Sequence, residues 1–191
     1  MLLWVILLVA AAAGLYAIII FNSLVRTRQM ANEAWSGIDV QLKRRSELVP
    51  NLVETVKGYA GHERSVLEDV TRLRGAARAV PDNDVASRAQ AETALSVALG
   101  KLVALAENYP DLKASANFLE LQQQLSQLEN ELQMARRYYN GTVRNQNVLV
   151  QSFPSNLIAG LFGFEQRQYF EVADEADRAT SAVAFQPPAA R

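Results

Sequence analysis

The chain has 191 residues, 50% of them hydrophobic, and its 19 basic and 20 acidic side chains leave a net charge of −1. This length fits one folded domain with an anchor, because single domains usually have about 100 to 200 residues. A chain without net positive charge has no long-range field that attracts nucleic acid, so we expect no nucleic-acid partner. The sequence contains no cysteine, which excludes disulfides, thiolate metal ligands and cysteine nucleophiles.

The sequence begins with an uncharged apolar run from Leu2 to Phe21. About twenty helical residues match the roughly 30 Å hydrocarbon core of a bilayer. The alternative is a cleaved secretory signal, but such signals have a basic start, a shorter apolar run and small residues at the cleavage site. We therefore expect residues 1–21 to be a retained transmembrane anchor. Its defining residues at the two ends are Leu2, Leu3, Trp4, Ile18, Ile19, Ile20 and Phe21.

The basic residues that follow the run indicate its orientation. Arg26 and Arg28 come directly after it, whereas no basic side chain precedes it. Positively charged flanks stay on the cytoplasmic side of a membrane helix. We expect a single-pass protein of the cell membrane with its N-terminus outside and its main domain in the cytoplasm.

From Ala31 to Tyr59 the apolar residues recur at alternating steps of four and three, which predicts a long helix with a coiled-coil-like heptad seam. Arg45 is the charged residue that interrupts the seam. Pro50 also lies within it, and because the pattern continues beyond the proline we expect a kinked helix and no break. Trp35 occupies a seam position and is expected to be buried in the helical bundle.

A second heptad seam runs from Phe118 to Tyr139 and predicts another long helix. Two shorter helices are expected between the long ones, separated by turns at Gly61, at residues 81–84 and at residues 108–110. Short connections make neighbouring helices antiparallel. The sequence therefore predicts an all-α fold: a transmembrane helix followed by an antiparallel up-and-down four-helix bundle at residues 22–151. The expected bundle core is Trp35, Ile38, Leu42, Leu52, Val56, Leu121, Leu125, Leu128 and Leu132.

A charged residue in a buried seam needs a partner, because an unpaired buried charge is costly. With the two long helices antiparallel and their membrane ends level, Arg45 lies opposite the region of Glu129 and Glu131. We therefore expect a buried ion pair between Arg45 and Glu129, with Glu131 as the alternative.

Residues 152–171 are the most apolar segment outside the anchor, and they follow a helix that returns toward the membrane. We expect this segment to lie near the membrane surface and to contact lipid or a neighbouring subunit; capping of the bundle is the alternative. The tail at residues 172–191 is expected to be disordered. The expected contact residues are Phe153, Leu157, Ile158, Leu161, Phe162 and Phe164.

The sequence offers no recognisable catalytic, metal or cofactor site. His62 is the single histidine and lies at a predicted turn, where an exposed turn residue is the favoured interpretation over a general base. It is not part of the Glu-x-x-His spacing of di-iron bundles. We therefore expect a protein that is not an enzyme and has no cofactor.

Short motifs in a fixed order cover the chain from about Phe21 to Glu171. Together they resemble the bacterial LemA family, and the resemblance implies one N-terminal membrane helix, a cytoplasmic helical domain and no established enzymatic activity. Among the motifs are Ala34-Trp35-Ser36, Leu48-Val49-Pro50-Asn51-Leu52-Val53, Tyr109-Pro110-Asp111-Leu112-Lys113, Tyr139-Asn140, Phe153-Pro154-Ser155-Asn156 and Tyr169-Phe170-Glu171.

Two functional hypotheses follow. The first is a membrane-anchored scaffold that self-assembles into a homo-oligomer and organises a membrane patch or a membrane protein complex. The second is an adaptor or sensor subunit of a membrane protease or a signalling complex, which conveys a signal along the continuous helix from the bilayer.

Overall fold

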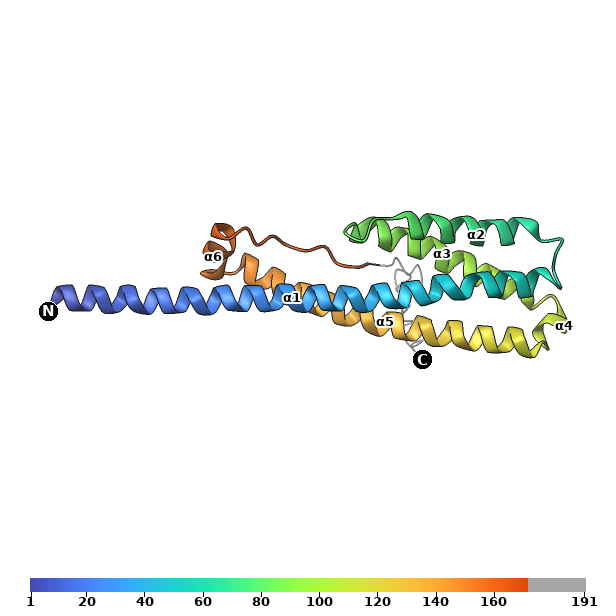
Figure 1. The fold of residues 1–191 in the computed structure, drawn as a ribbon, viewed down its shortest axis with the longest axis horizontal. Coiled ribbons are helices and arrows are strands. Elements are labelled where there is room, and N and C mark those ends of the chain that lie inside the picture. Colours follow the sequence, from blue (N-terminus) through green and yellow to red (C-terminus); the bar gives the residue numbers. More distant parts are fainter. Residues whose placement is uncertain (172–191) are drawn as a thin grey trace, which may run out of the picture.

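A computed structural model of the protein describes residues 1–171. These residues form an elongated molecule of helices without strands, which confirms the predicted all-α class (Figure 1). The expected disordered tail, residues 172–191, lies outside the described part of the chain. In chain order the helices are α1 (Leu2–Lys57), α2 (Arg64–Ala79), α3 (Val85–Ala106), α4 (Pro110–Lys113), α5 (Ala116–Gln151) and α6 (Ser155–Leu161).

α1 is one uninterrupted helix of 56 residues, about 84 Å long at 1.5 Å per residue. The predicted anchor and the first heptad seam are therefore parts of a single rod. The first part of this rod projects alone beyond the other helices (Figure 1). Only 6% of its most apolar 18-residue stretch is buried, and the helix is long and apolar enough to cross a membrane.

Pro50 lies inside α1, and the helix continues through it to Lys57 without a break. Because proline has no N–H, the carbonyl oxygen of Ser46, four residues earlier, loses its helical hydrogen bond. Arg74 of α2 supplies another donor, since its Nε lies 2.6 Å from that carbonyl oxygen. A contact between two helices thus satisfies the backbone group that the proline leaves open.

α2 and α3 form an antiparallel hairpin beside the half of α1 that lies far from the N-terminus (Figure 1). Asp84 caps α3, because its Oδ1 accepts a hydrogen bond from the Ser87 N–H at 3.0 Å. The indole Nε1 of Trp35 donates to the carbonyl oxygen of Asp82 at 3.0 Å. This bond attaches the predicted turn at residues 81–84 directly to α1.

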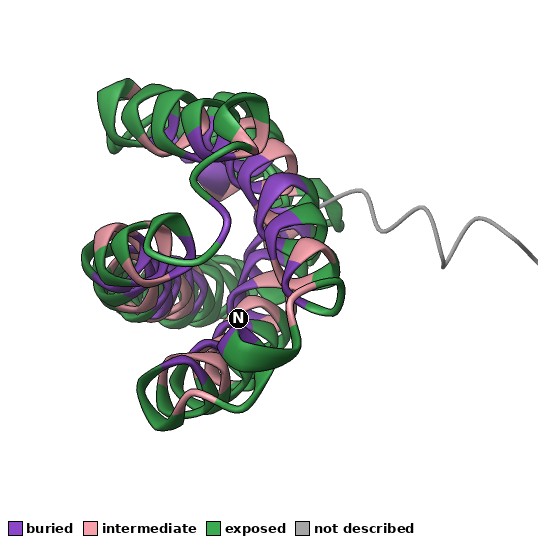
Figure 2. Cartoon of the chain, turned by 90° about the vertical axis from the view of Figure 1, so that its right-hand side faces the viewer, coloured by how far each residue is buried: buried purple, intermediate pink, exposed green. Residues whose placement is uncertain are grey.

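α5 has 36 residues and returns antiparallel along α1. Figure 2 shows that the buried positions gather on the sides of the helices that face one another. Two clusters form the core of the domain. The distal cluster includes Leu52, Val56, Leu95, Leu102 and Leu125, and the cluster nearer the membrane includes Ile38, Leu42, Leu132, Tyr139 and Val143.

Three of the expected core residues are only half-buried: Trp35, Leu121 and Leu128. The expectation that Trp35 is buried was therefore wrong, and Ala34 is buried in its place. A straight α-helix has 3.6 residues per turn whereas the heptad seam assumes 3.5, so seam positions drift toward the edge of the interface. Trp35 lies at such an edge, beside a cavity of about 600 Å³.

The contact between Arg74 and the Ser46 carbonyl oxygen predicts an energetic coupling between Arg74 and Pro50. Arg74→Ala should lower the free energy of unfolding of the detergent-solubilised chain by about 1–3 kcal/mol, because a backbone oxygen loses its donor. In a Pro50→Ala background residue 50 regains its N–H, so the same change should cost clearly less. Thermal unfolding of the four chains measures the coupling. Equal costs in both backgrounds would contradict this account, and Arg72→Ala, on the exposed side of α2, is the control.

Candidate membrane-proximal site

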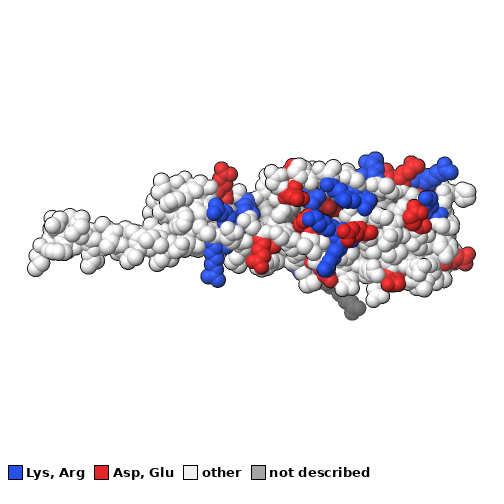
Figure 3. Space-filling view, in the orientation of Figure 1, with Lys and Arg blue, Asp and Glu red and all other residues white. Residues whose placement is uncertain are grey.

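One end of the molecule carries no charged side chain. Residues 1–25 and residues 145–164 contain no Lys, Arg, Asp or Glu, and the fold brings the two stretches together. Figure 3 shows the corresponding end without blue or red side chains up to a first charged band. In sequence the charges that border these stretches are Arg26, Arg144 and Glu165. The boundary between a lipid-compatible surface and a water-compatible surface therefore falls at this level of α1.

α6 packs against α1 at this boundary. Ile20 and Leu24 of α1 are buried together with Ala159 of α6 and Phe164. The ring of Phe21 has its centroid 4.8 Å from that of Phe162, a typical distance for an aromatic pair. The residues that end the predicted anchor are thus the residues that hold α6 beside it.

A cation–π contact fixes the water-facing edge of this packing. The guanidinium carbon of Arg28 lies 4.8 Å from the centroid of the Phe164 ring, within the range at which the ring attracts a cation. Phe164 also lies against Phe21, with ring centroids 5.9 Å apart. Arg28 therefore serves the fold as well as the charge asymmetry that flanks the anchor.

The expected contact segment divides into a buried face and an exposed face. Phe164 is buried with 6% of its surface exposed, and Ile158 is half-buried. For these two residues the expectation of an outward contact was wrong, because they cap the hydrophobic cluster formed by α1, α5 and α6. The other four side chains are exposed, by 80%, 62%, 76% and 55% for Phe153, Leu157, Leu161 and Phe162.

After α6 the chain turns back and runs as an extended arm, residues 163–171 (Figure 1). Hydrogen bonds to α5 hold this arm against that helix. Two asparagines of α5 bind the arm's backbone in the same way. Asn147 accepts from the Arg167 N–H at 2.8 Å and donates to the Arg167 carbonyl oxygen at 2.9 Å. Asn140 accepts from the Phe170 N–H at 2.9 Å and donates to the Phe170 carbonyl oxygen at 3.2 Å.

The spacing of these contacts has a simple geometric basis. Asn140 and Asn147 are one heptad apart, which is about 10.5 Å along a helix, and Arg167 and Phe170 are three residues apart, which is about 10 Å along an extended chain. The match lets each asparagine reach one residue of an antiparallel arm. Sequence reasoning missed these contacts, although two asparagines one heptad apart were a signal that could have revealed them.

The arm ends on an aromatic cluster. The Phe170 side chain is fully buried, and its ring lies 5.7 Å from that of Trp35, which is itself 5.4 Å from the ring of Tyr139. The Tyr139 hydroxyl donates to the Gln168 carbonyl oxygen at 3.1 Å. Burial raises the pKa of Tyr139 against the opposing effect of Arg167, so the phenol remains a neutral donor at neutral pH.

Arg45 is the largest buried polar side chain of the domain, with 1% of its surface exposed. The structure places its Nη1 2.6 Å from Glu129, the partner expected from the sequence, and 2.8 Å from the Ser96 hydroxyl. Its Nη2 contacts the Glu92 carboxylate. Glu131, the alternative partner, lies 3.5 Å from Arg44 instead. Glu92 and Ser96 were missed, because the sequence did not indicate how α3 sits against α1.

This network joins three helices around one cation. Burial alone would lower the pKa of Arg45, but the charges of Glu129 and Glu92 outweigh that effect and raise it. The side chain of Glu92 is 6% exposed and that of Glu129 is 37% exposed. Loss of Arg45 would therefore leave a carboxylate that water reaches poorly and another that water reaches well.

No catalytic or metal centre appears in the part of the chain that the structure describes. Residues 1–171 contain no group of three or more His, Asp or Glu arranged to hold a metal ion. His62 is exposed in the turn between α1 and α2. α3 is also long and apolar enough to cross a membrane, but 39% of its apolar stretch is buried in the domain core, as expected for a core helix.

The helical fold and its uncharged end define a membrane-associated helical protein. The chain belongs to the LemA family, whose model matches residues 34–185, and this confirms the resemblance found in the sequence. Members of the family are not known as enzymes.

Named relatives agree with this assignment. The protein LemA of Metamycoplasma hominis is 28% identical, with 72% of this chain and 63% of the relative covered. The magnetosome protein MamQ 2 of Paramagnetospirillum magneticum is 23% identical, with 82% and 66% covered. MamQ of Magnetospirillum gryphiswaldense is 22% identical over the same shares. The chain thus spans a little under two thirds of the length of these relatives.

The ion network predicts a large cost for removing Arg45 and a partial rescue. Arg45→Met should destabilise the full-length chain in detergent by about 3–5 kcal/mol, because it leaves two carboxylates without their cation. Glu92→Gln in the same chain should recover much of the loss, and Glu129→Gln should recover less because Glu129 is better solvated. Thermal unfolding of the single and double variants gives these values.

The control is Arg44→Met, which changes an exposed neighbour and should change stability by less than about 0.5 kcal/mol. Equal losses of stability for Arg44→Met and Arg45→Met would contradict the network.

The asparagine contacts predict that the arm depends on Asn147. Asn147→Ala removes two hydrogen bonds to Arg167, so amide hydrogen exchange in residues 165–170 should accelerate by about tenfold or more. Asn145→Ala changes an exposed residue of the same helix and should leave the exchange unchanged. The measurement is hydrogen–deuterium exchange of the full-length chain, read by mass spectrometry. Unchanged protection in Asn147→Ala would show that these bonds do not hold the arm.

Proposed function

We propose that this protein is a non-enzymatic, membrane-anchored scaffold that self-assembles and organises a membrane patch or a membrane protein complex. The single observation that carries the proposal is the exposed apolar surface at α6 and its two flanks, formed by Phe153, Leu157, Leu161 and Phe162. We name this surface the foot. Its four large side chains face outward at the level where the anchor ends, which is the place where lipid and neighbouring copies are both within reach.

The position of the foot supports membrane contact. Phe162 packs on Phe21, and about twenty residues of α1 before Phe21 are needed to cross the hydrocarbon core. The foot therefore lies at the depth of the headgroup region, where amphipathic helices rest with their apolar side inward. No charged residue between 145 and 164 opposes this placement.

The same surface supports the proposal of self-assembly. A seven-residue helix buries little area by itself, so a weak contact between copies gains strength when the anchor confines them to two dimensions. The domain lies in the cytoplasm in this proposal, because Arg26 and Arg28 follow the anchor. Relatives that are named magnetosome proteins support a role tied to membranes.

The second candidate function is an adaptor or sensor subunit of a membrane protease or a signalling complex. The observation that favours it is α1 itself, since one unbroken helix joins the anchor to the distal end of the domain. Such a rod can transmit a rotation or tilt from the bilayer. Co-purification from gently solubilised membranes separates the two: self-association supports the scaffold, and a stoichiometric protease or receptor supports the adaptor.

The natural absence of cysteine allows a direct test of the foot. Leu161→Cys carries a spin label on the foot, and Leu119→Cys carries the same label at an exposed position near the start of α5. In reconstituted bilayers the label at residue 161 should be reached by oxygen more than by a water-soluble relaxant, and it should show dipolar coupling between copies. The label at residue 119 should show neither effect.

Each outcome has a separate meaning. Oxygen accessibility without dipolar coupling would retain the membrane contact and refute self-assembly through the foot. Water accessibility without coupling would show that the segment only caps the helices, and Phe162→Asp should then leave assembly unchanged. If the foot acts as proposed, Phe162→Asp weakens assembly, whereas Leu119→Asp does not.

A further inference from the structure

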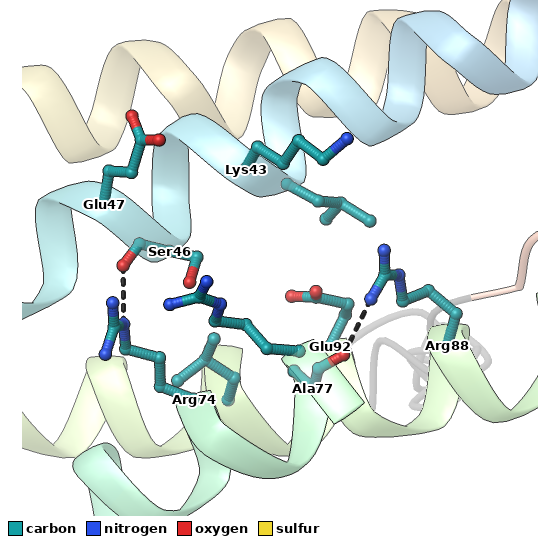
Figure 4. Close-up of a pocket in the computed structure, with 10 residues that line it drawn as sticks. Lys43, Ser46, Glu47, Arg74, Ala77, Arg88 and Glu92 are labelled. Atoms are coloured by element: carbon teal, nitrogen blue, oxygen red, sulfur yellow. Dashed lines mark hydrogen bonds between the residues drawn. The ribbon is translucent and has the colours of Figure 1, made fainter. Parts of the chain in front are cut away.

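A small charged cavity lies far from the foot, between α1, α2 and α3. Its volume is about 190 Å³, below the roughly 300–1,000 Å³ of pockets for drug-sized ligands. Figure 4 shows side chains from all three helices around it. Four basic residues line the cavity: Lys43, Arg74, Arg78 and Arg88.

The hydrogen bonds leave donors in this cavity without acceptors. Arg88 uses Nη1 on the Ala77 carbonyl oxygen and Nη2 on Asp39 and Asp82, but its buried Nε has no partner. The Ser46 hydroxyl is also buried without a partner. Buried polar groups in proteins are nearly always satisfied, so two open groups at one cavity indicate that something polar binds there.

The arginines of α2 add positive charge that the chain does not neutralise. Arg74 and Arg78 are four residues apart and lie on one face of the helix. Arg74 gives its Nε to a neutral acceptor, the Ser46 carbonyl oxygen. Arg78 makes no hydrogen bond or ion pair within the described residues. Like charges at this spacing repel each other, which favours an anion between them.

Two carboxylates also line the cavity, and neither fills it. Glu92 is engaged by Arg45 in the buried network. Figure 4 shows the carboxylate of Glu47 directed away from the guanidinium of Arg74. The side chains left free to meet a ligand are therefore mainly donors.

We propose that this cavity binds the phosphoryl group of a small, water-soluble compound, with inorganic phosphate as its simplest form. Guanidinium groups match the oxygens of a phosphoryl group in geometry and charge. The free donors come from Arg78, Arg74, Arg88 Nε and the Ser46 hydroxyl. The cavity has room for a phosphoryl group and a few waters, at about 30 Å³ for each water, and it is smaller than a nucleotide pocket.

The place of the cavity on α1 excludes a lipid headgroup as the source of this phosphoryl group. Ser46 and Phe21 are about 25 residues apart on one helix, which is about 37 Å. This distance exceeds the Debye length of about 8 Å at physiological ionic strength. The ligand must therefore reach the cavity from the aqueous phase.

Titration of the full-length chain in neutral micelles with phosphate and pyrophosphate, against chloride at equal ionic strength, tests the proposal. Calorimetry should show saturable binding at one site, and the thermal midpoint should rise with phosphate as the linkage relation requires. Arg78→Gln should weaken binding by about tenfold, because it removes a charge-assisted donor. The midpoint without phosphate should not fall, since Arg78 has no partner to lose and its repulsion of Arg74 is removed.

Matched variants separate a built site from general charge. Arg72→Gln removes the same charge from the same helix outside the cavity and should leave the affinity within twofold. Ser46→Ala should weaken binding severalfold, and Glu47→Gln should strengthen it by removing a nearby negative charge. Absence of binding beyond that of chloride, or equal effects of Arg72→Gln and Arg78→Gln, would overturn the proposal.

A final comparison distinguishes a soluble ligand from a lipid. The chain is placed in nanodiscs of neutral lipid and in nanodiscs that contain anionic phospholipid, and phosphate affinity is measured in both. Equal affinities are expected, because the cavity lies beyond reach of the headgroups. Competition that weakens phosphate binding in the anionic nanodiscs and disappears in Arg78→Gln would overturn the soluble source.

Discussion

The structure depends on one constraint: a single helix joins a strongly apolar, exposed stretch to the core of the folded domain. In the first part of α1, before Ile20, the large apolar side chains are exposed and no other helix of the described residues packs against them. In the second part, the side chains of α1 contribute to the core of the domain. Every other helix is placed by its contact with this rod. α5 has 36 residues, about 54 Å of helix, which is enough to return the chain to the level of Phe21. Because α5 returns this far, the foot lies beside the apolar end of α1. The absence of charged side chains in residues 145–164 suits a segment at that position.

Polar contacts set the register in which the helices pack against one another, because the apolar residues of the helices repeat along the sequence. Heptad seams tolerate slips of one turn, because one leucine replaces another. Arg45 meets both Glu92 and Glu129 only when α3 and α5 take their observed places. Arg74 reaches the Ser46 carbonyl oxygen only in one setting of α2, and Asn140 and Asn147 fix the arm. Each of these contacts would become an unsatisfied buried group in a shifted packing, so together they select one structure.

The uncharged end and the middle of the domain carry different surfaces. The uncharged end carries the foot, for which we propose contact with the membrane and with neighbouring copies, and the middle of the domain carries a small cavity lined by four basic residues, for which we propose a soluble anion. The Arg45 network separates the cavity from α5, and Glu92 belongs to both. An ion that enters the cavity would therefore act on residues that hold α1, α3 and α5 together. In a scaffold, such a site would connect the aqueous phase with the packing of the assembled domain.

The sequence by itself determined the two long and two shorter helices, the apolar character of the N-terminal helix, the position of the turns, the family and the pairing of Arg45 with the level of Glu129. These features follow from the heptad spacing of apolar residues and from the length of the N-terminal apolar run, and both can be seen in residues that are close in sequence. The tertiary structure decided which face of α6 is buried, that Phe164 is buried whereas Phe162 packs on Phe21 and stays largely exposed, and that Trp35 lies at an edge. It also decided which donors meet the Ser46 carbonyl oxygen and the arm. These facts depend on the rotation of each helix about its axis, which a heptad pattern leaves uncertain by a fraction of a turn because 3.6 residues do not divide evenly into seven.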